Sequence, residues 1–387
     1  MATVDARALE AHPGQGATRY PGIDATRAAA ALAVLVSHLT QTLTWRVPGW
    51  SAAAGSAAGP VRAFTGTAGA WGVGLFLVVS GACIHLPMAR RQADPGAALD
   101  ARAFFRRRFM RIYPPYAVAL ALSAALAWAM PASLLRSTLL TAPGPAQLAS
   151  HLLLIHTAIP GHHSGVSAVF WTIALEAHFY ALYPVLLRVR RWAGMGGLCA
   201  ILLALCILAR AAALAFLSPT GQFLVDASFL RRGWEFGLGM WVAERLGRDA
   251  GSWRLGRLAW AGLALATLLG GIGMALVPGA LRIRAFLWPL LFAATVEAAA
   301  RWSPGLGLAG RIGRWLGERS DSLYLVHPIG LATAMWLLPG WYGARGAAGA
   351  AMLVCTAVVL VAFYDLIEKP FAVQRSRKAD AGSASPA

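Results

Sequence analysis

The sequence has little charge, few acidic residues and few cysteines. Only 13% of its 387 residues are charged and 58% are hydrophobic, whereas an ordinary soluble domain has about 25% charged and about 45–50% apolar residues. The four cysteines lie inside apolar stretches without metal-ligand spacing, so the sequence indicates neither a disulfide framework nor a zinc site. We expect them to be small buried apolar side chains. They are Cys83, Cys199, Cys206 and Cys355.

Several sequence signatures of soluble enzymes are also missing. There is no glycine-rich phosphate loop, no Gly-x-Ser-x-Gly nucleophile elbow and no His-Glu-x-x-His zinc pair. The matching interrupted segments of a two-half transporter are not evident either. Between Met1 and Tyr20 the chain is polar, so we expect no cleavable signal peptide.

The basic residues do not form a nucleic-acid-binding patch. The formal net charge is +18, almost all of it from arginine, but the arginines lie in short clusters between apolar blocks. Such clusters are typical of cytoplasmic loops in membrane proteins. We therefore expect membrane lipids, and no nucleic acid, around this chain.

Apolar blocks of about 20 residues recur along the chain, and a helix of that length crosses about 30 Å of hydrocarbon. They predict an all-α polytopic membrane bundle of about ten spans. A shorter run, His151 to Pro160, is too short to cross and is expected at the interface or re-entering. The predicted domains are a polar N-terminus (1–20), a transmembrane domain (21–371) and a disordered tail (372–387). The spans are 22–43, 69–88, 112–130, 168–188, 196–217, 226–245, 257–277, 282–300, 320–338 and 346–368.

The distribution of arginine predicts the orientation. The loop after the second span holds the densest cluster, and later even-numbered loops are also rich in arginine, whereas odd-numbered loops are poor. Because positive charge stays inside, we expect both termini in the cytoplasm and the protein in the inner (cytoplasmic) membrane. The cluster comprises Arg90, Arg91, Arg102, Arg106, Arg107, Arg108 and Arg111.

Ionisable side chains inside spans indicate functional positions, because they are costly in hydrocarbon. The first span holds Asp24, Arg27 and His38. Arg27 and His38 are eleven residues apart, about 16 Å along one helix face. The topology places Arg27 near the cytoplasmic end, His38 beyond the midplane, and Glu176 of the fourth span at a depth similar to His38.

Each of these residues also has a structural interpretation. His38 alone is more simply a hydrogen-bonded structural group, and its pairing with an intramembrane arginine makes catalysis an equal alternative. Arg108 and Arg111 are explained equally well as topology determinants. Arg231, Arg232 and Glu235 have i,i+3 and i,i+4 spacing, which favours a structural ion-pair cluster over a substrate contact.

Six segments, taken together and in order, resemble the acyltransferase-3 family of membrane O-acyltransferases. They begin with "PGIDATRAAAALAVLVSH", which resembles the family's opening helix with its arginine and histidine, and end with "IEKPF". Between them lie "GVGLFLVVSGACI", "FFRRRFMRIYPPY", "VFWTIALEAHFYALYPVLL" and "SDSLYLVHPI". The matched positions include Asp24, Ser80, Arg108, Arg111, Trp171, Glu176, Tyr324 and His327.

The resemblance implies transfer of an acyl group, usually acetyl, from cytoplasmic acetyl-CoA to an acceptor hydroxyl, without a metal. Arg108 and Arg111 would then meet CoA phosphates. His38 would be the general base, Arg27 would stabilise the thioester or hold the CoA arm, and Glu176 would orient His38 or bind the sugar. His327 is the rival base, but counting from the start of its span places it further from an external acceptor.

The expected acceptor is a carbohydrate or glycolipid, such as an exopolysaccharide or lipopolysaccharide sugar. A transporter or exporter of a sugar or lipid-linked intermediate would explain the spans and buried charges equally well, but it does not predict the ordered motifs. A membrane scaffold for polysaccharide assembly is a third reading. The sequence predicts no particular oligomeric state.

Overall fold

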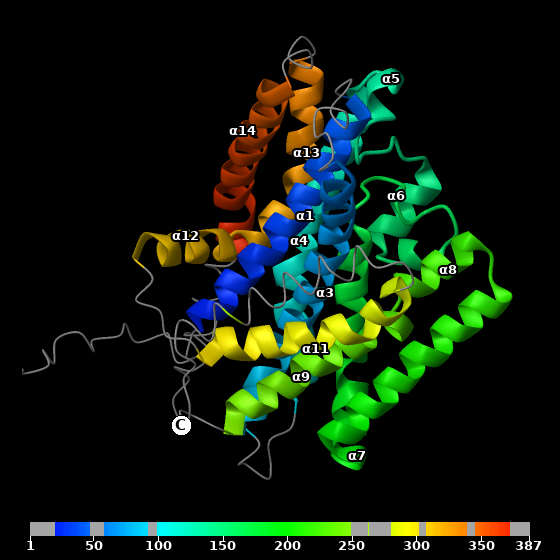
Figure 1. Cartoon of the computed structure of the whole chain (residues 1–387), viewed down its shortest axis with the longest axis vertical. Helices are drawn as coiled ribbons and strands as arrows, with labels where there is room; N and C mark the ends of the chain where they lie inside the picture. The colour runs from blue at the N-terminus through cyan, green and yellow to red at the C-terminus, as the bar shows by residue number, and fades with distance from the viewer. Residues whose placement is uncertain are drawn as a thin grey trace, which may run out of the picture.

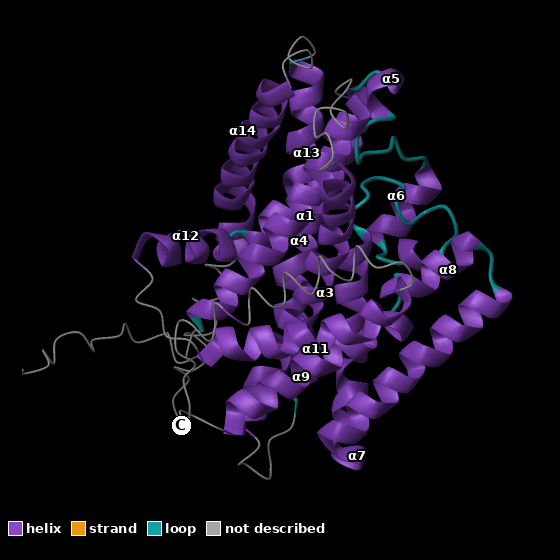
Figure 2. Ribbon diagram, viewed as in Figure 1, coloured by secondary structure: helices purple, strands orange, loops and turns teal. Residues whose placement is uncertain are grey.

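The described part of the chain is almost entirely helical. The computed structural model describes residues 20–46, 58–91, 99–248, 262, 280–301, 307–338 and 345–371. Within these ranges the extended structure amounts to one isolated antiparallel bridge between Leu140 and Ser167, and most of the remaining residues lie in helices joined by loops (Figure 2). The predicted all-α membrane bundle is confirmed for this part of the chain.

The helices form an upright group crossed at one end by shorter, inclined helices (Figure 1). Among the described helices, five are long and apolar enough to span a membrane: α1, α3, α4, α7 and the stretch Ala347–Phe371. The helices are α1 (Pro21–Arg46), α3 (Ala58–Arg90), α4 (Ala101–Ala129), α5 (Ala132–Leu135), α6 (Pro145–Leu152), η4 (His156–Ala158), α7 (Trp171–Phe216), α8 (Pro219–Asp226), α9 (Phe229–Arg248), α11 (Ala280–Arg301), α12 (Gly307–Glu318), α13 (Ser320–Leu337), α14 (Arg345–Phe363) and η6 (Tyr364–Glu368).

The long helix α7 is two helices joined at Gly194. There φ is 72° and ψ is 174°, a conformation that favours glycine because it has no Cβ. Before the break Arg190 reaches Glu244 near the end of α9, and after it Cys206 lies beside Arg231 near the start of α9. The chain therefore reverses at Gly194, and the two halves correspond to the predicted spans 168–188 and 196–217.

The other predicted spans correspond to described helices with one exception. The span 257–277 lies outside the described residues apart from Gly262, so the described helices leave the count of ten unconfirmed. The short run His151–Pro160 forms the end of α6 and the turn η4. The predicted polar N-terminus (1–20), apart from Tyr20, and the predicted tail (372–387) also lie outside the described residues.

Several helix ends meet at one end of the bundle, which we call the proximal end. The guanidinium of Arg90, at the end of α3, donates to the Tyr20 hydroxyl beside the start of α1 at 3.2 Å. Gly317 of α12 lies against the backbone of Asp24 in the first turn of α1. At the opposite, distal end Gly349 of α14 faces Leu43 of α1.

Helices α3 and α9 cross in backbone contact. A Cβ on Gly81 would collide with the carbonyl of Phe236, and one on Gly239 would collide with the carbonyl of Val78. Small residues permit such close helix crossings inside a membrane. The crossing fixes the part of α3 that carries Ser80, one residue before Gly81, and so positions one wall of the site described next.

Candidate active site

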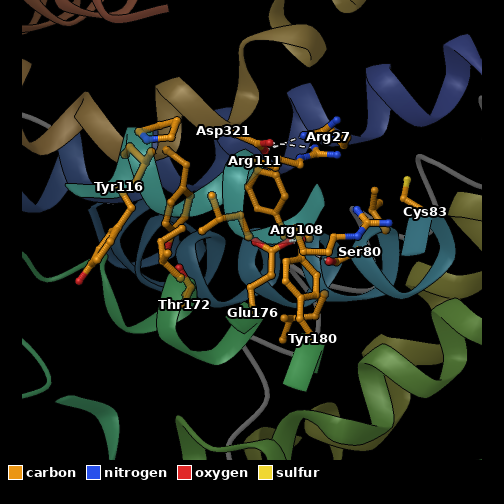
Figure 3. A pocket seen from close by; sticks show the side chains of 18 of the residues that line it. Arg27, Ser80, Cys83, Arg108, Arg111, Tyr116, Thr172, Glu176, Tyr180 and Asp321 are labelled. Atoms are coloured by element: carbon orange, nitrogen blue, oxygen red, sulfur yellow. Dashed lines mark hydrogen bonds and ion pairs between the residues drawn. The ribbon is translucent and has the colours of Figure 1, made fainter. Parts of the chain in front are cut away.

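A cavity of about 90 Å³ lies among α1, α3, α4, α7 and α13, and we call it the proximal chamber (Figure 3). Its wall combines apolar side chains from α3 and α4 with several ionisable groups. Ionisable groups within membrane spans that converge on one cavity indicate a functional site, and the six groups here are all partly buried. They are Arg27, Arg108, Arg111, Glu176, Asp321 and Glu368.

Asp321 links two of the arginines. Arg27 donates from Nη2 to one carboxylate oxygen of Asp321 at 2.6 Å, and Arg111 donates from Nη2 to the other at 2.9 Å. Because the three residues come from α1, α13 and α4, one carboxylate joins three helices. These charge-assisted bonds hold both guanidinium groups against the chamber.

Glu176 lies on the α7 wall of the same chamber. Its Oε1 accepts hydrogen bonds from the Tyr180 hydroxyl at 2.6 Å and from the Ser80 hydroxyl at 3.1 Å. Tyr180 is one turn further along α7, and Ser80 reaches Glu176 from α3. Glu176 therefore organises the chamber between two helices.

Arg108 is held differently from its neighbours. Its guanidinium carbon lies 5.4 Å from the ring centre of Tyr180 and 5.6 Å from that of Phe104. Cation–π contacts orient the group without neutralising its charge. Within the described residues Arg108 has no carboxylate partner, so its positive charge is available to an anion at the proximal end.

A second and larger cavity, of about 500 Å³, lies further along α1, and we call it the distal chamber. Its wall includes His38 and Gln41 of α1, Trp171 at the start of α7 and Arg232 of α9. The Arg232 guanidinium lies over the Trp171 ring at 5.8 Å. The chamber thus offers an imidazole, an amide and an indole face to a ligand.

The two chambers meet at the same pair of residues. Val73 of α3 and Tyr324 of α13 line both cavities. On α7, Trp171 belongs to the distal chamber, whereas Thr172 and Glu176 belong to the proximal one. Arg27 and His38, the pair predicted from the first span, therefore lie in different chambers along one helix.

His38 and His327 are in direct contact. Nδ1 of His38 lies 2.8 Å from Nε2 of His327, so the two imidazoles lie at a similar depth, which counting residues from the start of each span did not indicate. The predicted orientation of His38 by Glu176 is replaced as well, because the partner of His38 in the described chain is His327. His327 is fully buried and lines neither chamber.

The predicted α9 cluster forms in part. Arg232 pairs with Glu235 at 2.8 Å with i,i+3 spacing, as predicted. Arg231 instead turns toward Asp226 at 3.8 Å and the Cys206 thiol at 3.7 Å, because α8 brings that carboxylate to the start of α9.

The other predicted positions fall around the two chambers. Asp24 lies in the first turn of α1, where a carboxylate is favourable next to the helix dipole, and it lines neither chamber. Ser80 lines the proximal chamber and Trp171 the distal one. All four cysteines are free. Cys199 and Cys206 are buried as expected, whereas Cys83 and Cys355 are only partly buried.

Comparison with known proteins assigns the chain to a family. A family model described as an acyltransferase domain (acyltransferase 3) matches residues 20–364. The chain belongs to the acyltransferase-3 family. The comparisons with curated proteins and with solved structures each gave no match. This acyltransferase-3 protein is therefore a membrane acyltransferase, and both chambers lie within the matched domain.

Two ionisable residues of this acyltransferase were missed by the sequence interpretation. Asp321 lies in the predicted span 320–338, and Glu368 ends the predicted span 346–368. Glu368 accepts a short hydrogen bond from Ser322 at the edge of the proximal chamber. Both satisfy the rule that singled out Arg27 and Glu176, namely an ionisable group within a span, so applying that rule to every span would have found them.

Proposed function

We propose that this acyltransferase transfers an acetyl group from acetyl-CoA, bound at the proximal chamber, to a hydroxyl of a carbohydrate acceptor in the distal chamber. One observation carries the proposal: a chamber lined by Arg27, Arg108 and Arg111 and a chamber lined by His38 meet at Val73 and Tyr324. The donor needs cations for its phosphates, and the acceptor hydroxyl needs a base.

The proximal chamber suits the donor. Arg108 keeps an uncompensated charge and is free to bind a CoA phosphate at the arginine-rich, cytoplasmic end. Arg27 and Arg111 are held by Asp321 beside the path of the pantetheine arm. That arm is comparable in length to half the bilayer, about 15 Å, and Arg27 is about 16 Å from His38 along α1. We therefore assign Arg27 to the arm and not to the oxyanion.

The distal chamber suits a sugar. Trp171 presents an indole ring on which a sugar face can pack, and Gln41 and Asp226 can hydrogen-bond to hydroxyls. In the chemical step the acceptor O–H gives its proton to His38 while its oxygen bonds to the acyl carbon. The carbon–sulfur bond then breaks, and the CoA thiolate leaves and takes the proton back from the imidazolium. The products are an O-acetyl sugar and free CoA.

The test is transfer of labelled acetyl from acetyl-CoA to defined saccharides by the purified protein in nanodiscs. His38→Gln should lower turnover by about a hundredfold or more, because an amide cannot accept the proton. Donor binding should survive, since the arginines lie in the other chamber. His162→Gln is the matched control, because His162 lies in the loop after η4 and bonds Ser150 at 2.9 Å. A wild-type protein that transports a saccharide without acetylating any acceptor would contradict the proposal.

A further inference from the structure

The half-buried His38 and the buried His327 form a linear hydrogen bond between nearly coplanar rings. The ring centres of His38 and His327 are 5.1 Å apart and the ring planes differ by 12°. The distance between the ring centres is longer than the 2.8 Å between Nδ1 and Nε2 by about the width of one ring. Because each nitrogen lies about half a ring width from its own centre, both nitrogens lie on the line that joins the two centres. This edge-to-edge arrangement is the geometry of a well-aligned N–H···N bond.

The hydrogen-bond partner of Nδ1 of His327 determines which nitrogens of the two rings carry hydrogen. Nδ1 of His327 lies 3.1 Å from the carbonyl oxygen of Leu323. A carbonyl only accepts, so this nitrogen carries the hydrogen. Nε2 of a neutral His327 is then a lone pair, and the hydrogen between the rings must belong to Nδ1 of His38. His38 is left with a lone pair on Nε2.

That lone pair is the one available to the distal chamber. His38 is half-buried and lines the chamber, whereas His327 is fully buried and lines neither cavity. Nε2 of His38 has no hydrogen-bond partner among the described residues. The nearest carboxylate along α13, Asp321, is already engaged by Arg27 and Arg111, so the chain of bonds ends on a backbone carbonyl.

We propose that His327 is a positioning residue that holds His38 in the Nδ1–H tautomer and makes Nε2 of His38 the base atom. This inference rests on the proposed role of His38. When Nε2 accepts the acceptor proton, the Nδ1–H bond to a neutral imidazole stabilises the charge that develops on His38. A group that fixes tautomer and orientation acts in the same way in other histidine-based catalysts.

Two substitutions at residue 327 separate positioning from packing. His327→Gln keeps an amide oxygen near the place of Nε2 and can still accept from His38, whereas His327→Leu fills similar space without an acceptor. We expect His327→Leu to lower turnover by about a hundredfold with unchanged KM for acetyl-CoA, and His327→Gln to recover at least tenfold of that loss. Equal turnover in the two variants would overturn the proposal.

A second measurement does not depend on turnover. Diethylpyrocarbonate acylates the lone pair of an unprotonated imidazole nitrogen, and mass spectrometry locates the adduct. At pH 7.5 His38 should be modified and His327 protected, because both nitrogens of His327 are bonded. In His38→Ala the freed Nε2 of His327 should become reactive. If His327 in the wild type is modified as fast as His38, the proposed positioning of His38 by His327 is refuted.

The two failures are distinguishable. If the modification pattern is as expected but no saccharide is acetylated, the positioning role of His327 stands and the proposed function is wrong. If the protein acetylates a saccharide, needs His38 and tolerates His327→Leu, the proposed function stands and the positioning role is wrong.

Discussion

Arg27 lies 2.6 Å from a carboxylate oxygen of Asp321, a residue 294 positions further along the chain. The same carboxylate binds Arg111 with its other oxygen. A single acidic group therefore sets the position of two of the three arginines at the proximal chamber. Loss of that group should disturb donor binding before it disturbs the histidine chemistry.

The first prediction concerns this carboxylate. Asp321→Asn should raise the KM for acetyl-CoA by about tenfold or more, because a neutral amide leaves two guanidinium groups without their counter-charge. Steady-state kinetics with acetyl-CoA varied at saturating acceptor measures it. Asp365→Asn is the control, since Asp365 forms an exposed pair with Lys369 that should contribute little. A KM that is the same in both variants would remove Asp321 from the donor site.

The second prediction distinguishes the two motif arginines. Arg108→Ala should weaken acetyl-CoA binding by about 1.5–3 kcal/mol, the usual value of a charge-assisted hydrogen bond, without loss of folded protein. Arg108→Lys should recover part of this, because it keeps the charge and loses the planar fork. Arg111→Ala should also loosen Asp321. Calorimetric titration with CoA measures the affinity, and unchanged affinity in the double alanine variant would support a role in topology alone.

The third prediction concerns orientation. Reporter fusions at residue 140 and after residue 375 should report opposite sides of the membrane, with the second in the cytoplasm, because the Arg90–Arg111 loop holds the densest positive cluster. Paired alkaline phosphatase and fluorescent protein fusions measure this. If both sites report the same side, the predicted order of spans is wrong.

The fourth prediction concerns the loop that carries α6 and η4. The rings of His151 and His156 stack with centres 3.8 Å apart, and both are fully buried. Burial lowers the pKa of His151 to about 4 and, with help from the neighbouring His151, that of His156 to about 3. In the unfolded loop each histidine has its ordinary pKa of about 6.5. Between the folded and unfolded pKa values, the unfolded loop therefore binds more protons than the folded loop. Stability is therefore complete above about pH 6.5 and lost as the pH falls.

Hydrogen exchange of this loop measures the effect. At pH 5 the opening free energy of residues 145–158 should fall by about 2 kcal/mol for each histidine relative to pH 7.5, after correction for intrinsic exchange rates. His156→Phe keeps a buried ring that does not titrate and should reduce the pH dependence. Opening that is independent of pH in the wild type would show that the pair is not buried in solution.

Most of the fold was predictable from the sequence, because the apolar blocks and the arginine clusters are both determined by the lipid environment. The contact between His38 and His327 was not. Arg27 and His38 are eleven residues apart on α1, whereas their partners Asp321 and His327 are six apart on α13. The helices are inclined to one another, as Figure 1 shows for α1. Counting residues from the start of each span misplaced His327, because span lengths carry no information about crossing angles.

The backbone contact between α3 and α9 has a consequence for how the protein enters the membrane. Helix α9 carries Glu235 and Glu244, both almost fully buried, and it is not among the helices apolar enough to span on their own. Such a segment does not partition into lipid alone. Helix α9 should therefore leave the translocon only after α3 and α7 are beside it. Gly81→Leu, which blocks the contact between α3 and α9, should prevent α9 from inserting during synthesis, before the protein has folded.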